Sequence, residues 1–173
     1  SADYLSPMGY GYLYGYVPGI IPTHGIKLTA MHQMKLSDSP FGQTIVNILP
    51  RGLSENSALL SWLSIRNRHI TKVTADYAFP VFIGDLAIGG NFFSIKRLVV
   101  NPHFDYTFAG GYGLFSAGAE LILDLNSILT LEWPCSFGIT YSYNGGNGLE
   151  SLEQQLGTAI GRHFVGPTFN VSF

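Results

Sequence analysis

The chain has 173 residues, of which 46% are hydrophobic, 14% aromatic and only 12% charged, with a formal net charge of −2. Soluble domains carry roughly a quarter charged residues, so this composition is typical of a lipid-facing protein. No stretch approaches the ~20 apolar residues of a membrane helix, so a membrane would be crossed by strands. The weakly acidic balance and the lack of a basic run exclude nucleic acid as an expected partner.

Seven stretches alternate with period two, which predicts seven β-strands. In the first of them, tyrosine occupies one parity and glycine most of the other. Across the set, one face carries the charges and the other face is rich in tyrosine and phenylalanine. In chain order the predicted strands are Met8–Val17, His24–Leu36, His69–Val81, Ile95–Phe108, Phe115–Leu125, Phe137–Tyr143 and His163–Phe173.

The connections between these strands alternate in length. Two are long surface loops, at 37–67 and 145–162, whereas modest turns are expected at Pro18–Thr23, Ile83–Gly90 and Asn126–Pro134, with Ala109–Gly111 as a tight exception. Short turns at one end and long loops at the other are typical of outer-membrane barrels. In the first long loop Leu59–Ile65 fits either a short strand or a helix. In the second, 148–160 has the apolar spacing of a surface helix, which would cap the barrel or dock a partner.

The predicted fold class is therefore all-β, as an antiparallel transmembrane β-barrel located in the cell outer membrane and in contact with its lipid. A soluble sandwich is the alternative, because alternation alone does not separate the two. The end of the chain favours the barrel, since Phe169, Val171 and Phe173 look like the C-terminal signal of outer-membrane barrels. Single-chain barrels close with an even number of strands, so seven strands predict that 1–173 is one domain, the C-terminal part of a larger barrel. An N-terminal part or another chain would complete it.

Pro50-Arg51-Gly52 stands out within the apolar stretch Phe41–Leu53. Proline followed closely by glycine predicts a turn. Arg51 is a permanent charge with five donors among Phe, Ile, Val and Leu, so it requires an anion. The other reading is an exposed turn arginine that has no partner.

These stretches together resemble the C-terminal barrel of the BamA and TamA superfamily of outer-membrane assembly factors. The motifs that carry the resemblance are LPRGL at Leu49–Leu53, TADYAFP at Thr74–Pro80, HFDYTFAGG from His103, and FSAGAELILDL at Phe115–Leu125. Three positions depart from the pattern: Leu53 stands where an aromatic is usual, Asp76 replaces a glutamate, and Thr107 replaces a common glycine. The pattern is also similar to barrels fused behind a TolB-like propeller.

The resemblance implies a sixteen-stranded barrel whose long loop folds back into the lumen. It also implies that Arg51 meets acidic residues of the next two strands, which are Asp76 and Asp105 here; both lie on the predicted polar face. The implied function is insertion or translocation of client proteins. The alternative is a passive anchor or pore that holds a propeller or a partner complex at the membrane.

Other chemistry is sparse. Asn101, His103 and Asp105 share one face, as the general base and its orienting group do in barrel hydrolases. His103 and Asp105 lie side by side rather than converging, however, and no serine is specifically placed as a nucleophile, so no enzyme is expected. Cys135 is the only cysteine, and the other four histidines lack metal-ligand spacing. We therefore expect neither a metal nor a cofactor.

Overall fold

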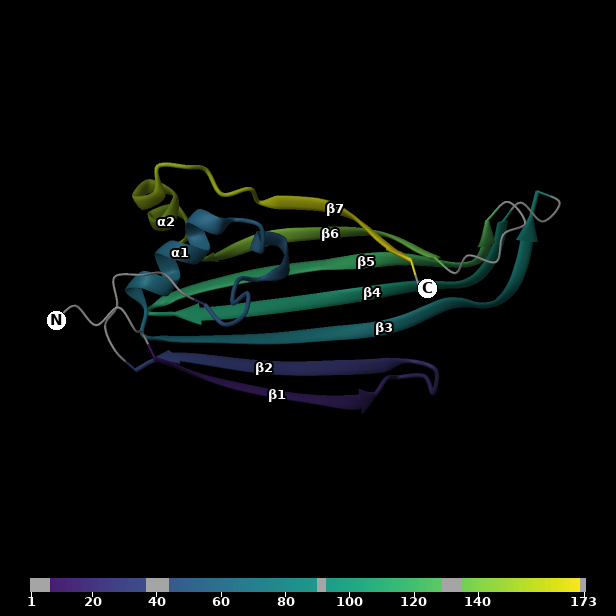
Figure 1. Ribbon diagram of the computed structural model, residues 1–173, viewed down its shortest axis with the longest axis horizontal. Coiled ribbons are helices and arrows are strands. Elements are labelled where there is room, and N and C mark those ends of the chain that lie inside the picture. Colours follow the sequence, from purple (N-terminus) through teal and green to yellow (C-terminus); the bar gives the residue numbers. More distant parts are fainter. Residues whose placement is uncertain (1–6, 37–43, 90–92, 129–134, 172–173) are drawn as a thin grey trace.

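The computed structural model describes residues 7–36, 44–89, 93–128 and 135–171. They form one antiparallel sheet of seven strands in sequential order, which confirms the all-β class and the number of strands (Figure 1). The sheet is not closed: β1 and β7 are its edges. The strands are β1 (Met8–Pro18), β2 (Gly25–Lys35), β3 (His69–Ile88), β4 (Phe93–Ala109), β5 (Tyr112–Ile128), β6 (Cys135–Asn147) and β7 (His163–Val171).

Several strands run further than their sequence pattern predicts. The turn expected at Ile83–Gly90 is wrong, because β3 continues to Ile88. Register shifts between Pro80 and Phe82 and between Ile83 and Leu86 interrupt the alternation without ending the pairing with β4. β5 likewise extends to Ile128, and residues 129–134 of the expected Asn126–Pro134 turn lie outside the described residues.

The second predicted loop also begins too early. Gly145–Asn147 belong to β6, where they pair with residues 113–115 of β5. Glycine-rich sequence suggests a loop tip, but here the small residues allow close approach to β5, since a Cβ at Gly145 would lie 2.6 Å from the Phe115 ring. Helix α2 (Leu149–Leu156) follows almost at once, between Gly148 and Gly157, which both have positive φ.

The long connection between β2 and β3 contains a 3₁₀ turn, η1 (Arg51–Leu53), and helix α1 (Ser57–Arg66). The open choice at Leu59–Ile65 is thus resolved as helix. The side chain of Asn56 caps α1 by accepting a hydrogen bond from the Leu59 amide at 3.0 Å. No helix in the described part of the chain is long and apolar enough to cross a membrane.

The segment 44–66 and α2 cover one face of the sheet near one end (Figure 1). They enclose a small apolar core with the adjoining strand ends. Its buried members are Ile48, Leu49, Leu53, Leu59, Leu63, Ile70, Ala109, Leu114, Leu149, Leu152 and Ile160. Each fully buried leucine or isoleucine contributes about 1.5–3 kcal/mol, so this core is a main reason that the segment stays on the sheet.

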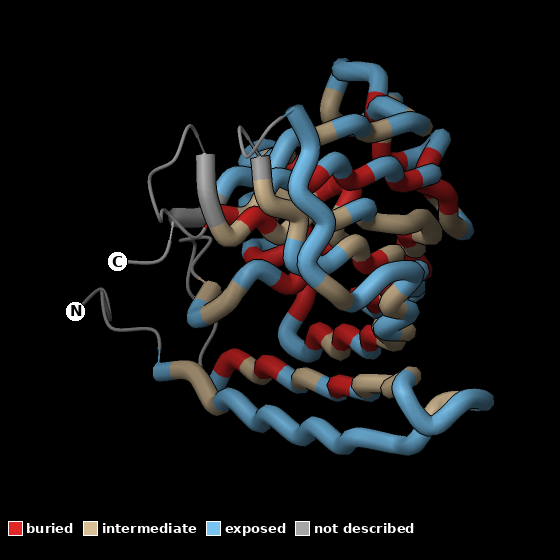
Figure 2. Tube along the Cα trace, turned by 90° about the vertical axis from the view of Figure 1, so that its right-hand side faces the viewer, coloured by how far each residue is buried: buried red, intermediate tan, exposed pale blue. Residues whose placement is uncertain are grey.

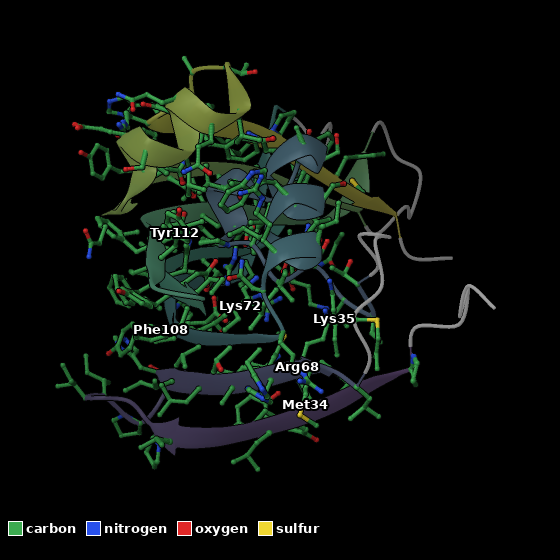
Figure 3. All side chains as sticks on the ribbon, turned by 90° about the vertical axis from the view of Figure 1, so that its left-hand side faces the viewer. Met34, Lys35, Arg68, Lys72, Phe108 and Tyr112 are labelled. Carbon is green, nitrogen blue, oxygen red and sulfur yellow. The ribbon has the colours of Figure 1, made fainter. Side chains whose placement is uncertain are left out.

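The two faces of the sheet have opposite character. The covered one, called the polar face below, buries polar side chains from β2 to β6: Thr29, Gln33, Lys35, Lys72, Thr74, His103, Asp105, Thr107, Ser116, Thr140, Ser142 and Asn144. The opposite one, called the apolar face, exposes Leu28, Val73, Phe79, Phe104, Phe108, Leu121, Phe137, Ile139, Tyr141, Tyr143, Val165 and Phe169. In Figure 3 Lys72 lies on the side of the helices and Phe108 on the other side.

The tyrosines of β1 do not follow the predicted division into a charged face and an aromatic face. Tyr16 pairs with Lys27, which pairs with Asp76, and Tyr14 pairs with Thr29. Directly paired residues lie on the same face, so the tyrosines of β1 lie on the polar face. Figure 2 shows β1 exposed along most of its length, whereas β2 beside it alternates between buried and exposed residues.

Candidate functional site

Arg51 lies over the middle of the polar face, between β3 and β4. Its guanidinium Nη2 is 2.6 Å from Asp76 Oδ1 and 3.3 Å from Asp105 Oδ1. The backbone N–H of Arg51 also donates to Asp105 Oδ2 at 2.7 Å. The structure therefore brings together the arginine and both acids that the sequence singled out.

Asp76 and Asp105 contribute unequally to holding Arg51, and the shorter ion pair is the weaker one. Asp76 makes the shorter contact, but its side chain is 28% exposed and that of Arg51 is 34% exposed. Ion pairs with this much solvent contribute about 0–1 kcal/mol. The Asp105 side chain is 0% exposed and accepts two hydrogen bonds from Arg51. Asp105 is therefore the acid that fixes the segment, because an uncompensated buried charge is far more costly than a broken surface pair.

Gly52 brings the backbone into direct contact with β5 and β6. Its N–H donates to Ser116 Oγ at 3.1 Å, and its carbonyl accepts from Asn144 Nδ2 at 3.1 Å. A Cβ at this position would collide with Asn144 Oδ1 and would lie 2.8 Å from Ser142 Cβ. Only glycine allows this approach, which is why the motif has glycine after Arg51. Pro50, before η1, is wholly buried as well.

The carbonyls just before the motif are satisfied by β3 and β4. Lys72 Nζ donates to the Leu49 carbonyl at 2.6 Å and to the Asn47 carbonyl at 3.5 Å. Thr107 Oγ1 donates to the Ile48 carbonyl at 2.7 Å. The irregular backbone thus obtains from the strands the hydrogen bonds that it does not make within itself.

Replacing Lys72 by methionine tests this anchoring. Methionine keeps the apolar stem but leaves the Leu49 and Asn47 carbonyls unpaired at a buried site, so we expect the protein to lose about 1–3 kcal/mol of unfolding free energy. Urea unfolding measures this loss. Lys27→Met is the matched control, since Lys27 makes no hydrogen bond within the described residues. Equal losses for both variants would contradict the role assigned to Lys72.

Sequence reasoning did not identify Ser116, Asn144, Thr107 and Lys72 as partners of the loop. All four side chains lie on the same face of the sheet as Asp76 and Asp105. The alternation along each strand could have indicated this face. The segment contacts only some polar residues of that face. Which ones it contacts depends on how closely its turn packs onto the strands, and the sequence does not specify this. Thr107 forms one of these contacts, with the Ile48 carbonyl.

A serine lies next to His103 in the structure. His103 Nε2 is 2.9 Å from Ser142 Oγ. Ser142 is fully buried beneath Gly52, and His103 Nδ1 has no partner within the described residues. A serine–histidine pair of this kind is activated when a third group orients the base, and here Asp105 is directed to Arg51 instead.

Two cavities flank Arg51 on the polar face. The first, of about 260 Å³, is lined by Tyr16, Gly25, Lys27, Arg51, Asp76, Ala78, Asn101 and Glu120. The second, of about 360 Å³, lies toward β7 and shares Arg51 and Glu120 with the first. Within the described residues, no group of three or more His, Cys, Asp or Glu side chains could hold a metal ion.

Two residues of the expected C-terminal signal, Phe169 and Val171, lie on the last strand. Phe169 is exposed on the apolar face, and Val171 is the final residue of β7. Phe173 lies outside the described residues. Comparison of the chain with models of protein families, with curated proteins and with solved structures found no match.

Proposed function

We propose that the chain is part of an antiparallel transmembrane β-barrel of the bacterial outer membrane, whose segment 44–66 is held inside the lumen by Arg51 and which assists the insertion or translocation of other proteins. The polar face would line the lumen and the apolar face would contact lipid. Further strands, from the same polypeptide or from another chain, would close the sheet beyond β1 and β7.

The observation that carries the membrane proposal is the reversed burial of the two faces. A soluble sandwich buries its apolar face and exposes its charged one. Here Asp105, Ser142 and Thr107 are 0% exposed, whereas Phe104 is 46% and Ile139 58% exposed. Water would oppose so large an apolar surface, and lipid would favour it.

Histidine and aromatic side chains contact one another at two levels of the apolar face, and we assign these levels to the two membrane interfaces. Near the cap end, the rings of His32 and His69 stack with centroids 5.7 Å apart. Near the turn end, His24 Nδ1 lies 2.6 Å from the Tyr77 hydroxyl. His69 and Tyr77 are eight positions apart on β3. That separation corresponds to about 27 Å along a strand and about 20 Å across a membrane at a ~40° tilt, close to the ~25 Å apolar band of such barrels.

The assembly function draws its support from the family resemblance together with the seated segment. In the resembling assembly factors, the corresponding loop folds into the lumen and its arginine meets acids on the next two strands. Here Arg51 makes ion pairs with Asp76 and Asp105, the acids of the next two strands. Because one fold serves many functions, the activity needs a direct test.

Depleting the protein in the cells that produce it provides this test. If it assists insertion, the levels of other outer-membrane barrels should fall severalfold while periplasmic proteins stay constant, as measured by quantitative proteomics of isolated outer membranes. Re-expression of the unaltered gene should restore them. Unchanged levels of other barrels would contradict the assembly function and favour a passive anchor.

A further inference from the structure

The tyrosines of β1 form a continuous row on the polar face, called the tyrosine row below: Tyr10, Tyr12, Tyr14 and Tyr16. Neighbouring rings contact one another, with centroid separations of 6.5, 5.6 and 5.9 Å. In the proposed barrel this row would lie inside the lumen. It therefore has no role in anchoring the protein in lipid, although its composition suggests one.

The row is exposed within the described part of the chain. Exposure rises along it from 38% at Tyr10 to 71% at Tyr16, so the segment that covers β3 to β6 leaves it free. None of the four hydroxyls makes a hydrogen bond within the described residues. Between the tyrosines, Gly9, Gly11 and Gly15 leave the apolar side of β1 with few side chains. Aromatic surface on this strand is thus concentrated on the polar face.

The exposed end of the row opens into the first cavity beside Arg51. Tyr16 lines it together with Lys27, Asp76, Glu120 and Asn101. Both signs of charge are present, so the cavity does not select a ligand of one charge. Asn101 Oδ1 is buried without a hydrogen-bond partner in the described part of the chain, so it would gain one if a donor came within reach.

We propose that the tyrosine row and this cavity bind an extended segment of a client polypeptide; the proposal rests on the proposed assembly function. An extended chain repeats every two residues, or about 6.6–6.8 Å, close to the 5.6–6.5 Å spacing of the rings. Each tyrosine hydroxyl can then form a hydrogen bond with a backbone group at every second residue of the bound segment. The rings of Tyr10 and Tyr12 are stacked, whereas those of Tyr14 and Tyr16 meet edge to face.

Site-specific photocrosslinking in the complete protein tests the location. Benzoylphenylalanine replaces Tyr12 or Tyr14, and replaces Leu13 of the same strand as the control, because Leu13 lies on the apolar face. The probe is a synthetic strand-forming peptide with the sequence HFVGPTFNVSF, with maltoheptaose as a competitor. We expect peptide adducts at 12 and 14, few at 13, and no competition by the glycan. Equal adducts at all three positions, or displacement by maltoheptaose, would overturn the proposal.

Affinity measurements complete the test. The double variant Tyr12→Phe/Tyr14→Phe keeps the rings but removes two hydroxyls, so we expect peptide affinity to fall about tenfold. Leu13→Ala should leave it unchanged, and protease resistance in detergent confirms that each variant folds. An unchanged affinity in the double variant would refute the hydroxyl contacts. If depletion leaves other barrels unaffected but the adducts form, the assembly function fails and the polypeptide site stands.

Discussion

Replacing Asp105 by alanine is expected to lower the free energy that holds segment 44–66 on the sheet by about 3–5 kcal/mol. The variant removes a fully buried carboxylate and leaves both the backbone N–H and the guanidinium of Arg51 without that acceptor. Hydrogen exchange at the Arg51 and Gly52 amides reports the opening of the segment directly. Trypsin cleavage after Arg51 gives an independent measure.

Asp76→Ala is the matched control for this prediction. It removes the shorter of the two ion pairs, yet Asp76 and Arg51 are partly solvated, so the loss should be about 1 kcal/mol or less. Equal losses for the two variants would contradict the assignment of Asp105 as the acid that fixes the segment.

A double variant that exchanges Arg51 and Asp105 should recover only part of the stability that either single substitution loses. An arginine at 105 can pair with an aspartate at 51, but it cannot accept the backbone N–H that Asp105 Oδ2 accepts at 2.7 Å. A double variant that recovers nothing would show that the side chains of 51 and 105 do not interact.

Replacing Gly52 by alanine is expected to lift η1 from β5 and β6. The added Cβ would collide with Asn144 Oδ1 and lie 2.9 Å from Ser116 Oγ, so the turn loses two hydrogen bonds or the strands must shift. Overpacking of this kind costs about 1–3 kcal/mol before the lost hydrogen bonds are counted. Faster exchange of the Gly52 amide and a lower urea midpoint are the expected results.

Gly15→Ala is the control for the Gly52 variant, because a Cβ at Gly15 has nothing within 4 Å. It should change stability by less than about 0.5 kcal/mol, as surface substitutions do. If Gly52→Ala behaves in the same way, the close seating of η1 on the strands is wrong.

The period-two pattern predicted the existence of every strand, because successive side chains of a strand point to opposite faces of the sheet. It failed at strand ends, where pairing rather than alternation keeps the chain extended. β3 passes through two register shifts before it ends at Ile88, and β6 includes Gly145 and Gly146, whose small size suits a neighbouring strand as well as a turn. These endings depend on partners distant in the sequence.

The candidate site could be predicted only in part from the sequence. Arg51 stood out as a lone charge in an apolar stretch, and parity placed Asp76 and Asp105 on one face. The contacts of Gly52 with Ser116 and Asn144 depend on the depth at which the turn is seated, which its local sequence does not encode. The face of the β1 tyrosines likewise depends on the register with β2, since a shift of one residue would reverse it.

Oxygen accessibility along β2 tests most directly the proposal that the apolar face contacts lipid. Nitroxide labels on single cysteines at 26–32, in a Cys135→Ala background and in phospholipid vesicles, report collision with lipid-soluble oxygen and with a water-soluble nickel complex. We predict oxygen maxima at Ile26, Leu28 and Ala30, on the apolar face, with nickel excluded there. Nickel collisions that are strongest at these three positions would contradict a lipid-facing wall.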